Sequence, residues 1–554
     1  MNPQSGVRVL LDASVVSRCR HRVHLDATAA GAGMSELARR PIPAGAVQRR
    51  EAAALHRRTV REMMAAHHHE GWIAIDPDQA MRERANDTLA ACAEGFQWIW
   101  GAVLPVDENG RRGGAELLVR DPGGTGYIPV IVVNHKVTDP GSGAMTSPVT
   151  RFDPRPDQRR RIRSQPRDQF RLAHLYRILE SVGLAAPRAI GGVIGYDADC
   201  ILAHDLGRET PAYGRSVLAE YDFRLADRRD IVAGRARTSP DRVGECKMCE
   251  WWPHCKTRLE ESHDVSLVVN GAQADMLREA GLPTIDALAS TSASAPAAWH
   301  GVPFGHVQAF ARAWLHDVPL IRMVEWPQVR RADIEVDIDM ESYQDHGAYL
   351  WGTLLTERDS EPQYRPFVTW DPLPTREEGR NFAEFWEWLT SIRRDAAQRG
   401  LTFAAYCYSK NAENRWLIES AQRFRGMNDM PSVAEVTRFI NSEEWVDMLD
   451  AVQEQFLCPH GRGLKKVAPV AGFSWHDPDA GGEASMSWYR DAVGYEGGPP
   501  VPDQQQRLLR YNEDDVWATR VLREWMDSPR VLEVPTEEEL DTRYRAELDD
   551  EARD

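Results

Sequence analysis

Two hydrophobic patterns alternate along this chain. Short apolar runs, such as residues 127–133 and 403–408, predict buried strands, whereas a longer stretch with apolar residues at every third or fourth position, such as 378–399, predicts a helix. Strands interleaved with helices are typical of α/β proteins. At 554 residues, the chain has room for two to four domains of this kind.

The charge composition narrows the possible functions. A net charge of -17 argues against loose, charge-driven coating of nucleic acid, but it is compatible with an enzyme that collects carboxylates around metal ions. No apolar run reaches the length of a membrane span, and the first residues lack the basic-then-apolar pattern of a signal peptide. We therefore expect a cytoplasmic protein without a membrane partner.

A predicted β-hairpin carries the first group of candidate site residues. Its first strand, 113–119, contains Glu116, and its second, 127–136, ends in Asn134 and Lys136. An acid on one strand followed by acid-x-Lys on the next is the core of a metal nuclease, in which carboxylates hold Mg²⁺ and the lysine steadies the attacking water. Because Asn134 replaces the second acid, we expect a degenerate site that binds DNA rather than cuts it.

The segment 151–171 is rich in arginine. It is either a basic stretch that follows a phosphate backbone or a solvated, proline-interrupted linker. The residues that we consider for nucleic-acid binding here are Arg159, Arg160 and Arg161.

Three cysteines form a compact motif. Cys246, Cys249 and Cys255 are separated by two and five residues, a spacing that lets one loop wrap a metal centre. Zinc would take His254 or a distant cysteine as its fourth ligand. An iron–sulfur cluster would take four thiolates, with Cys19 as the fourth.

Residues 272–288 predict two short helices around Gly281. This unit resembles helix–hairpin–helix modules, in which backbone N–H groups at a glycine-containing turn contact phosphate. A plain helical connector is the alternative.

The C-terminal third carries acids at spacings that bring them together. Along the predicted strand 334–342, the period of two places Asp337, Asp339 and Glu341 on one face. Such a face inside a sheet needs cations to offset its repulsion. Nearer the C-terminus, Tyr511 and Asp515 are four residues apart in a predicted helix and so share one side of it.

These residues suit a two-metal phosphodiester hydrolase. Carboxylates in such enzymes hold two Mg²⁺ or Mn²⁺ ions about 3.5–4 Å apart, and Tyr511 would orient the attacking water. Glu413, at a strand-to-helix junction, is the candidate third ligand, with Asp447 as its rival. Lys465 and Lys466 are candidates for binding nucleic acid. The predicted catalytic residues are Asp339, Glu341, Glu413, Tyr511 and Asp515, and the predicted Mg²⁺ or Mn²⁺ ligands are Asp339, Glu341 and Asp515.

Residues 8–262 resemble the RecB-like nuclease domains that carry an iron–sulfur staple. The order of elements is similar: an early lone cysteine, an acid strand, an x-x-Lys strand, a Gln/Tyr helix and a three-cysteine motif. Gln169 and Tyr176 are out of register with the family motif, and Arg171 takes the place of the glutamine. The resemblance implies a 4Fe–4S cluster on Cys19, Cys246, Cys249 and Cys255.

Residues 331–528 resemble the DEDD exonucleases of the RNase H-like fold and, more closely, the YprB-type domain. Four segments carry the resemblance, and Cys407 stands where the family has a histidine. These segments are Asp339–Glu341, Tyr406–Glu413, Gly463–Ala468 and Tyr511–Asp515.

The two resemblances together imply one architecture. We expect a restriction-endonuclease-like (RecB-type) domain at 8–262, a helical connector at 263–328, an RNase H-like domain at 329–530 and an acidic tail at 531–554. The implied function is a metal-dependent 3′→5′ exonuclease on single-stranded DNA ends, with a helicase as a possible partner. A non-catalytic nucleic-acid-binding protein with degenerate sites and an RNA-directed nuclease are the alternatives.

Overall fold

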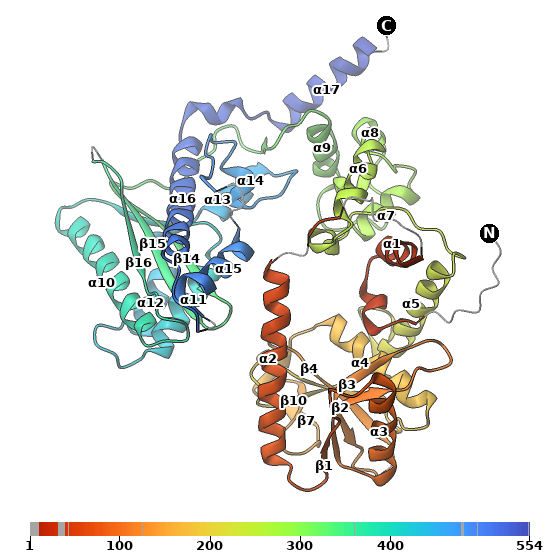
Figure 1. The fold of residues 1–554 in the computed structure, drawn as a ribbon. Coiled ribbons are helices and arrows are strands. Elements are labelled where there is room, and N and C mark those ends of the chain that lie inside the picture. Colours follow the sequence, from red (N-terminus) through yellow and green to blue (C-terminus); the bar gives the residue numbers. More distant parts are fainter. Residues whose placement is uncertain are drawn as a thin grey trace. The chain divides into compact units, whose positions relative to one another are not determined.

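The structure is a computed structural model that describes residues 10–31, 39–41, 44–124, 126–358, 360–477, 481–495, 497–551 and 553. The chain divides into two compact units, residues 1–258 and 259–554 (Figure 1). Residue 8, where the first domain was predicted to begin, lies outside the described residues. Among the helices that are described, none combines the length and apolarity that a membrane crossing requires.

The first unit is built on an eight-stranded mixed sheet with the order β1-β2-β3-β4-β9-β10-β6-β7. The predicted hairpin is the antiparallel pair β3 and β4, and β9 runs parallel to β4. The strands are β1 (Trp72–Ala74), β2 (Trp98–Leu104), β3 (Gly113–Arg120), β4 (Tyr127–Val132), β6 (Ala144–Ser147), β7 (Arg155–Asp157), β9 (Ile190–Ile194) and β10 (Ile201–Asp205).

Helices cover both faces of this sheet. On one face, α2 (Ala44–His67) packs Val60 and Met64 against Trp98 and Trp100. The other face carries α3 (Met81–Glu94), α4 (Pro166–Ser181) and α5 (Val217–Val232), with α1 (Arg20–Gly31) against α5. The arginine-rich segment contributes β8 (Arg160–Ile162), which pairs with β5 (Thr138–Pro140).

The second unit contains a five-stranded mixed sheet with the order β16-β15-β14-β17-β18. The central strand β14 pairs antiparallel with β15 and parallel with β17. The strands are β14 (Ile334–Tyr343), β15 (Gly347–Glu357), β16 (Gln363–Val368), β17 (Phe403–Cys407) and β18 (Trp445–Asp447).

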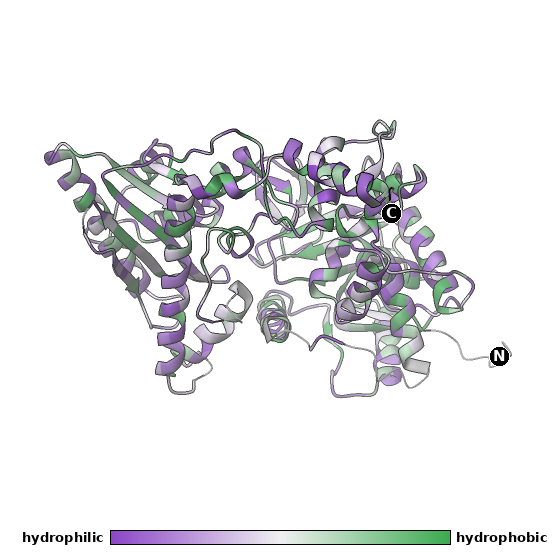
Figure 2. Ribbon diagram, turned by 90° about the horizontal axis from the view of Figure 1, so that it is seen from above, coloured by the Kyte–Doolittle hydropathy of each residue, from purple (hydrophilic) through white to green (hydrophobic). Residues whose placement is uncertain are grey.

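This sheet lies between two helical layers. Ile334, Val336, Ile338 and Met340 of β14 face one apolar core, which is closed by α10 (Glu377–Gln398), α11 (Lys410–Arg423) and α12 (Val433–Ile440). The long helix α16 (Pro502–Met526) covers the opposite face, where the acids of β14 point. Hydrophobic residues gather on the strands, whereas the outward sides of the helices are hydrophilic (Figure 2).

Three short elements complete the region around α16. They are α13 (Met448–Gln455), α14 (Leu464–Val467) and α15 (Gly482–Val493). Of these, α14 and α15 contact α16 directly. A separate two-stranded sheet pairs β13 (Ile321–Arg322) with β19 (Phe456–Leu457), which follows α13 in the chain.

The predicted connector is helical, and the acidic C-terminal segment packs on it. The connector contains α7 (Ala272–Glu279), α8 (Ile285–Ser290) and α9 (Phe304–Leu315). Residues Glu537–Glu551 form α17, whose Leu540 and Tyr544 are buried against the connector's cores. Asp541 of α17 also pairs with Arg312 of α9 at 2.9 Å. The segment predicted as a tail is therefore part of the packed unit over these residues.

Candidate metal centre

The acidic face of β14 is divided into two halves. In the first half, Glu335 and Asp337 both pair with Arg523 of α16, whose side chain is completely buried; Arg523 Nη2 lies 2.6 Å from Asp337 Oδ2. Arg331 adds a second guanidinium at 2.8 Å from Glu335 Oε1. The repulsion predicted for this face is thus offset in one half by arginine.

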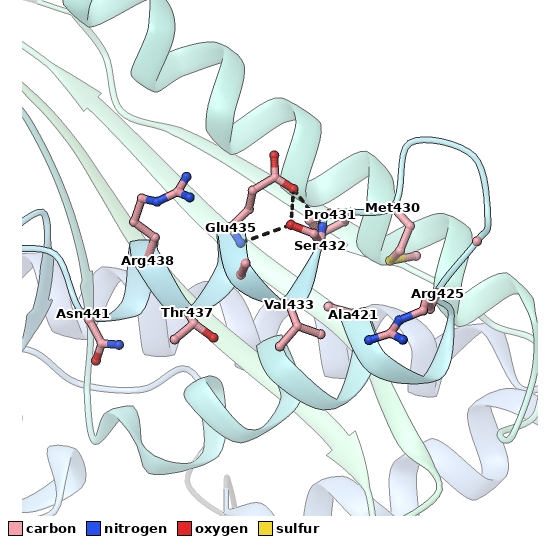
Figure 3. Close-up of a pocket in the computed structure, with 12 residues that line it drawn as sticks. Ala421, Arg425, Met430, Pro431, Ser432, Val433, Glu435, Thr437, Arg438 and Asn441 are labelled. Carbon is pink, nitrogen blue, oxygen red and sulfur yellow. Dashed lines mark hydrogen bonds between the residues drawn. The ribbon is translucent and has the colours of Figure 1, made fainter.

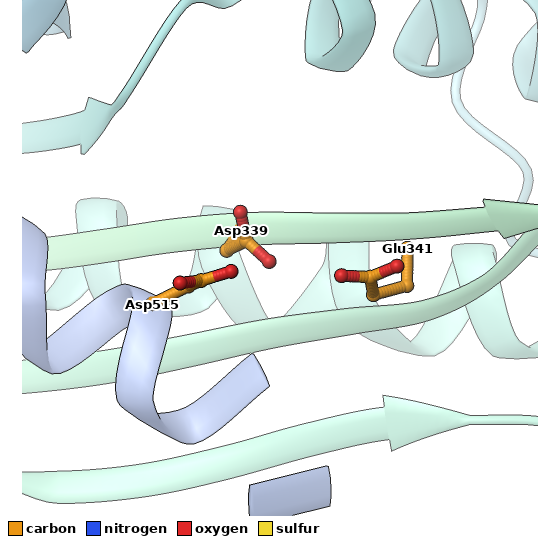
Figure 4. Close-up of side chains that lie close together, drawn as sticks. All are labelled: Asp339, Glu341 and Asp515. Atoms are coloured by element: carbon orange, nitrogen blue, oxygen red, sulfur yellow. The ribbon is translucent and has the colours of Figure 1, made fainter. Parts of the chain in front are cut away.

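The second half of the face has a different environment. Asp339 and Glu341 of β14 and Asp515 of α16 each offer one oxygen, and these oxygens lie within 4.8 Å of one another. Figure 4 shows the three carboxylates pointing toward one another from the strand and the helix. Glu341 and Asp515 are buried, and Asp339 is half-buried.

The electrostatics of this group suit a bound cation. Burial, together with the neighbouring carboxylates, raises the pKa of Asp339 and Glu341 well above the ordinary range. Burial likewise raises the pKa of Asp515 to about 6. Lys465 is the ammonium that acts on all three, and burial lowers its own pKa. Three converging oxygen ligands in a buried setting fit a hard divalent ion such as Mg²⁺ or Mn²⁺.

Neutral donors hold each carboxylate in place. Asn512 Nδ2 donates to Asp339 Oδ2 at 2.8 Å, and Trp475 Nε1 donates to Asp515 Oδ1 at 2.7 Å. Ser485 Oγ donates to Glu341 Oε2 at 3.2 Å. These three residues were missed by the sequence analysis. Asn512 lies three residues before Asp515, a spacing that could have placed it on the same helix face; Trp475 and Ser485 have no comparable local signal.

Tyr511 and one of the two predicted lysines, Lys465, lie beside the group. Tyr511 hydrogen-bonds Asp515, as residues four apart in a helix can, and burial with three nearby carboxylates raises the pKa of its hydroxyl. The Lys465 ammonium lies 4.5 Å from the centre of the Tyr511 ring. Lys466, by contrast, is exposed.

The two candidates for a further ligand differ in their hydrogen bonding. Glu413, in the first turn of α11, is buried, and its Oε2 has no hydrogen-bond partner in the described part of the chain. Burial raises its pKa well above the ordinary range, and Asp339 adds to the shift. Asp447 instead accepts from the backbone N–H groups of Ser409, Lys410 and Leu449 at 2.9–3.0 Å. Glu413 is therefore the acid with free ligand capacity, although it stands outside the convergent group of three.

The candidate residues of the first unit are arranged differently. Glu116 of β3 receives Arg171 Nη2 at 2.8 and 2.9 Å, and the Val132 backbone N–H at 3.2 Å. Asn134 and Lys136 lie in the half-buried segment after β4. Among the residues that the structure describes, Glu116 belongs to no group of converging metal ligands. Arg171 thus supplies the positive charge beside this acid.

The arginines predicted to bind nucleic acid do not behave alike. Arg160 forms a two-point ion pair with Asp199, at 2.6 and 2.8 Å. Arg159 and Arg161 are exposed, on either side of it.

The four cysteines come from three separate elements. Cys19 directly precedes α1, Cys246 and Cys249 lie in and after the turn Gly244–Met248, and Cys255 lies in the helix Trp252–Glu261. Burial, together with the other three cysteines, raises the pKa of Cys255 to about 12, so all four are electrostatic neighbours. Within the described part of the chain, their sulfurs do not converge as a single ion requires. A Zn–S bond of about 2.3 Å in tetrahedral geometry places sulfurs about 3.8 Å apart.

A groove between α11 and α12 lies apart from the carboxylates. It has a volume of about 1100 Å³ and is lined by residues such as Met430, Val433 and Arg438 (Figure 3). Its carboxylate, Glu435, accepts from the Ser432 backbone N–H at 2.8 Å and so caps α12. This groove offers no converging set of metal ligands.

Comparison with known proteins assigns one part of the chain. No curated protein and no solved structure matches it. Residues 336–527 match the family model of the RNase H superfamily, and this range runs from β14 to the end of α16 and so contains all three convergent carboxylates. The chain therefore carries an RNase H superfamily domain at residues 336–527, whereas its first unit has no family assignment.

Proposed function

We propose that this protein is a metal-dependent nuclease whose chemistry takes place in the RNase H-like domain. The observation that carries the proposal is the convergence of Asp339, Glu341 and Asp515 in a domain whose superfamily typically hydrolyses phosphodiesters. The setting supports the proposal, since one half-buried and two buried carboxylates lie beside a single ammonium, that of Lys465, and a divalent cation would offset their mutual repulsion.

The residues of the site divide the work of hydrolysis. Asp339, Glu341 and Asp515 would hold Mg²⁺ or Mn²⁺. Glu413, whose pKa Asp339 raises and whose Oε2 accepts no hydrogen bond from the described residues, would supply an additional ligand atom. Metal ions in such a site polarise the phosphate and lower the pKa of a bound water. Tyr511, hydrogen-bonded to Asp515, would orient the attacking water. Lys465 would contact a phosphate oxygen, because its ammonium lies beside the carboxylates.

The substrate that we propose is the 3′ end of single-stranded DNA. Support comes from the resemblance of the Asp-x-Glu strand and the Tyr-x-x-x-Asp helix to DEDD exonucleases. RNA is the alternative substrate. The net charge of -17 favours delivery by a partner, such as a helicase, over unaided capture of nucleic acid.

Digestion of end-labelled substrates tests this proposal. Single-stranded DNA and RNA, labelled at either the 5′ or the 3′ end, are incubated with Mn²⁺ and native protein, Asp515→Asn or the matched control Glu116→Gln. We expect mononucleotides released from the 3′ end of DNA by the native protein and the control, and none by Asp515→Asn. Hydrolysis that survives in Asp515→Asn and disappears in Glu116→Gln would place the chemistry in the first unit and overturn the proposal.

For the first unit we propose a RecB-type domain at 8–262 that binds nucleic acid and is stapled by a 4Fe–4S cluster. Cys19, Cys246, Cys249 and Cys255 are electrostatic neighbours, and a cluster separates its cysteine sulfurs more than one zinc ion does. Protein purified anaerobically should be brown and contain iron and sulfide, both lost in Cys246→Ser. A colourless protein with one stoichiometric zinc would overturn the cluster.

A second candidate function is binding without hydrolysis, and one observation favours it for the first unit. Arg171 engages Glu116 through both carboxylate oxygens, and Asn134 supplies no charge. The second unit keeps its carboxylates together, which supports an active site there. Tight DNA binding without cleavage by the native protein, at any Mn²⁺ concentration, would favour this alternative.

A further inference from the structure

Asn512 is completely buried between α16 and the sheet of the second unit. Its Nδ2 donates to the Oδ2 of Asp339 at 2.8 Å and reaches the Asp339 backbone carbonyl at 3.3 Å. One amide thus contacts both the side chain and the backbone of the strand residue at the centre of the candidate metal site.

The orientation of this amide is set from the other side. Tyr364 of β16 donates its hydroxyl hydrogen to Asn512 Oδ1 at 2.8 Å. An amide oxygen only accepts hydrogen bonds, whereas an amide nitrogen only donates. Because the Asp339 backbone carbonyl also only accepts, Nδ2 is the atom that faces Asp339, and Oδ1 is the atom that accepts from Tyr364.

The strand between Tyr364 and Asp339 makes room for the amide. Gly352 of β15 pairs directly with Asp339 of β14. A Cβ atom at position 352 would lie 1.6 Å from Asn512 Oδ1. Only glycine at position 352 leaves space for the amide. The amide therefore contacts or lies against residues of β14, β15 and β16 from its own helix, α16.

We infer that Asn512 is a positioning residue that holds one oxygen of Asp339 and leaves the other oriented toward a divalent cation. This inference rests on the proposed function of the same site. Two positions earlier on the same face, Asp337 meets the guanidinium of Arg523, which neutralises it. A neutral amide fixes the carboxylate without supplying a competing positive charge, and such supporting partners set metal affinity.

The affinity for Mn²⁺, measured by calorimetry on the protein without nucleic acid, tests the inference. Asn512→Leu keeps a buried side chain of similar volume and removes the donor. We expect its Mn²⁺ affinity to fall about 10–100-fold, the usual effect of losing such a partner. Hydrolysis should require a correspondingly higher Mn²⁺ concentration for its half-maximal rate. Tyr364→Phe, which removes only the hydroxyl that orients the amide, should show a smaller loss in the same direction.

Thr353→Val is the matched control. Thr353 is buried next to Gly352, and its hydroxyl donates to the Arg365 carbonyl at 2.8 Å, on the opposite face of β15. Like Asn512→Leu, this variant loses one buried hydrogen bond, so its thermal stability should fall. Its Mn²⁺ affinity should stay within about twofold of the native value, because Thr353 does not contact the metal site.

The outcomes separate this inference from the proposed function. Native-like Mn²⁺ affinity in Asn512→Leu, with affinity lost in Asp515→Asn, would overturn the positioning role and leave the metal site intact. An equal loss in Thr353→Val would also overturn it, because the effect would then be structural. A loss of Mn²⁺ affinity in Asn512→Leu and Tyr364→Phe but not in Thr353→Val would support the positioning role. If the native protein then hydrolysed none of the substrates, that result would count against the proposed nuclease.

Discussion

Each unit has an acid on a strand of a mixed sheet, and the two carboxylates have different hydrogen-bond partners. Glu116 in the first unit receives a guanidinium from Arg171 at both oxygens. Asp339 in the second receives a neutral amide from Asn512 and faces two further carboxylates. A guanidinium satisfies the charge of an acid as well as its hydrogen bonds, whereas an amide satisfies only the hydrogen bonds. The carboxylates of the second unit therefore have no guanidinium partner, and a metal ion can bind their oxygens.

The same contrast recurs within one strand. Asp337 and Asp339 project from the same face of β14, yet Asp337 forms an ion pair with Arg523 and Asp339 accepts a hydrogen bond from Asn512. Both partners come from α16, which therefore separates a pair of acids matched by a guanidinium from a pair without one. A strand of alternating acids can thus serve packing at one end and chemistry at the other.

The largest effect should come from removing the strand acid of the second unit, and the matched change in the first unit should have almost none. Asp339→Asn should lower the rate of Mn²⁺-stimulated hydrolysis about 10³-fold, because several kcal/mol of transition-state stabilisation depend on the metal site. Glu116→Gln should change the rate less than about twofold, since the first unit contributes no metal-dependent step in this account. Initial rates on the same labelled DNA measure both, and equal losses in the two variants would contradict the comparison.

The next effect concerns stability and the two arginines. Arg523→Met should lower the free energy of unfolding by about 3–5 kcal/mol, because Glu335 and Asp337 lose their buried partner. Arg171→Met should cost about 1 kcal/mol or less, because that pair is partly exposed. Denaturant unfolding followed by tryptophan fluorescence compares them. A smaller loss for Arg523→Met than for Arg171→Met would contradict the assignment of Arg523 as the buried counter-charge.

A smaller loss of stability is expected from closing the space beside Asn512. Gly352→Ala places a methyl group against Asn512 Oδ1 and should cost about 1–3 kcal/mol through overpacking. Gly498→Ala is its control, because a Cβ atom there meets nothing within 4 Å. Thermal unfolding of the two variants should differ accordingly, and equal midpoints would show that the amide does not occupy the position described.

The smallest expected effect is a gain of function in the first unit. Asn134→Asp with Arg171→Gln restores an acid and removes the guanidinium that engages Glu116. In an Asp515→Asn background, this double substitution should create weak Mn²⁺ binding that Asp515→Asn alone lacks. Calorimetry detects it, and its absence would mean that more than the balance of charge distinguishes the two sites.

The sequence predicted the parts of the site that follow a local period. Alternation placed Asp339 and Glu341 on one face of β14, and the four-residue spacing placed Tyr511 beside Asp515 on α16. The mixed α/β organisation and an RNase H-like second sheet are confirmed, whereas the roles of the site residues stay predictions. These features depend on neighbours in the chain, which a sequence displays directly.

The remaining features depend on contacts between distant segments. That Arg523 would meet Asp337 and Asn512 would meet Asp339 requires knowing how α16 lies across β14. Trp475 comes from a segment without regular structure, so no periodicity reveals its bond to Asp515. The packing of α17 also depends on a distant segment. Its sequence is mostly acidic, which predicts a solvated segment, but Leu540 and Tyr544 pack against α9, more than two hundred residues earlier in the chain.

Calorimetric titration with Mn²⁺ of the native protein, Asp515→Asn and Glu116→Gln shows which unit binds the metal, and it requires no knowledge of the substrate. We expect the native protein and Glu116→Gln to bind Mn²⁺ with the same affinity, and we expect Asp515→Asn to lose this binding. Binding that is unchanged in Asp515→Asn and lost in Glu116→Gln would contradict it, and would place the metal in the first unit.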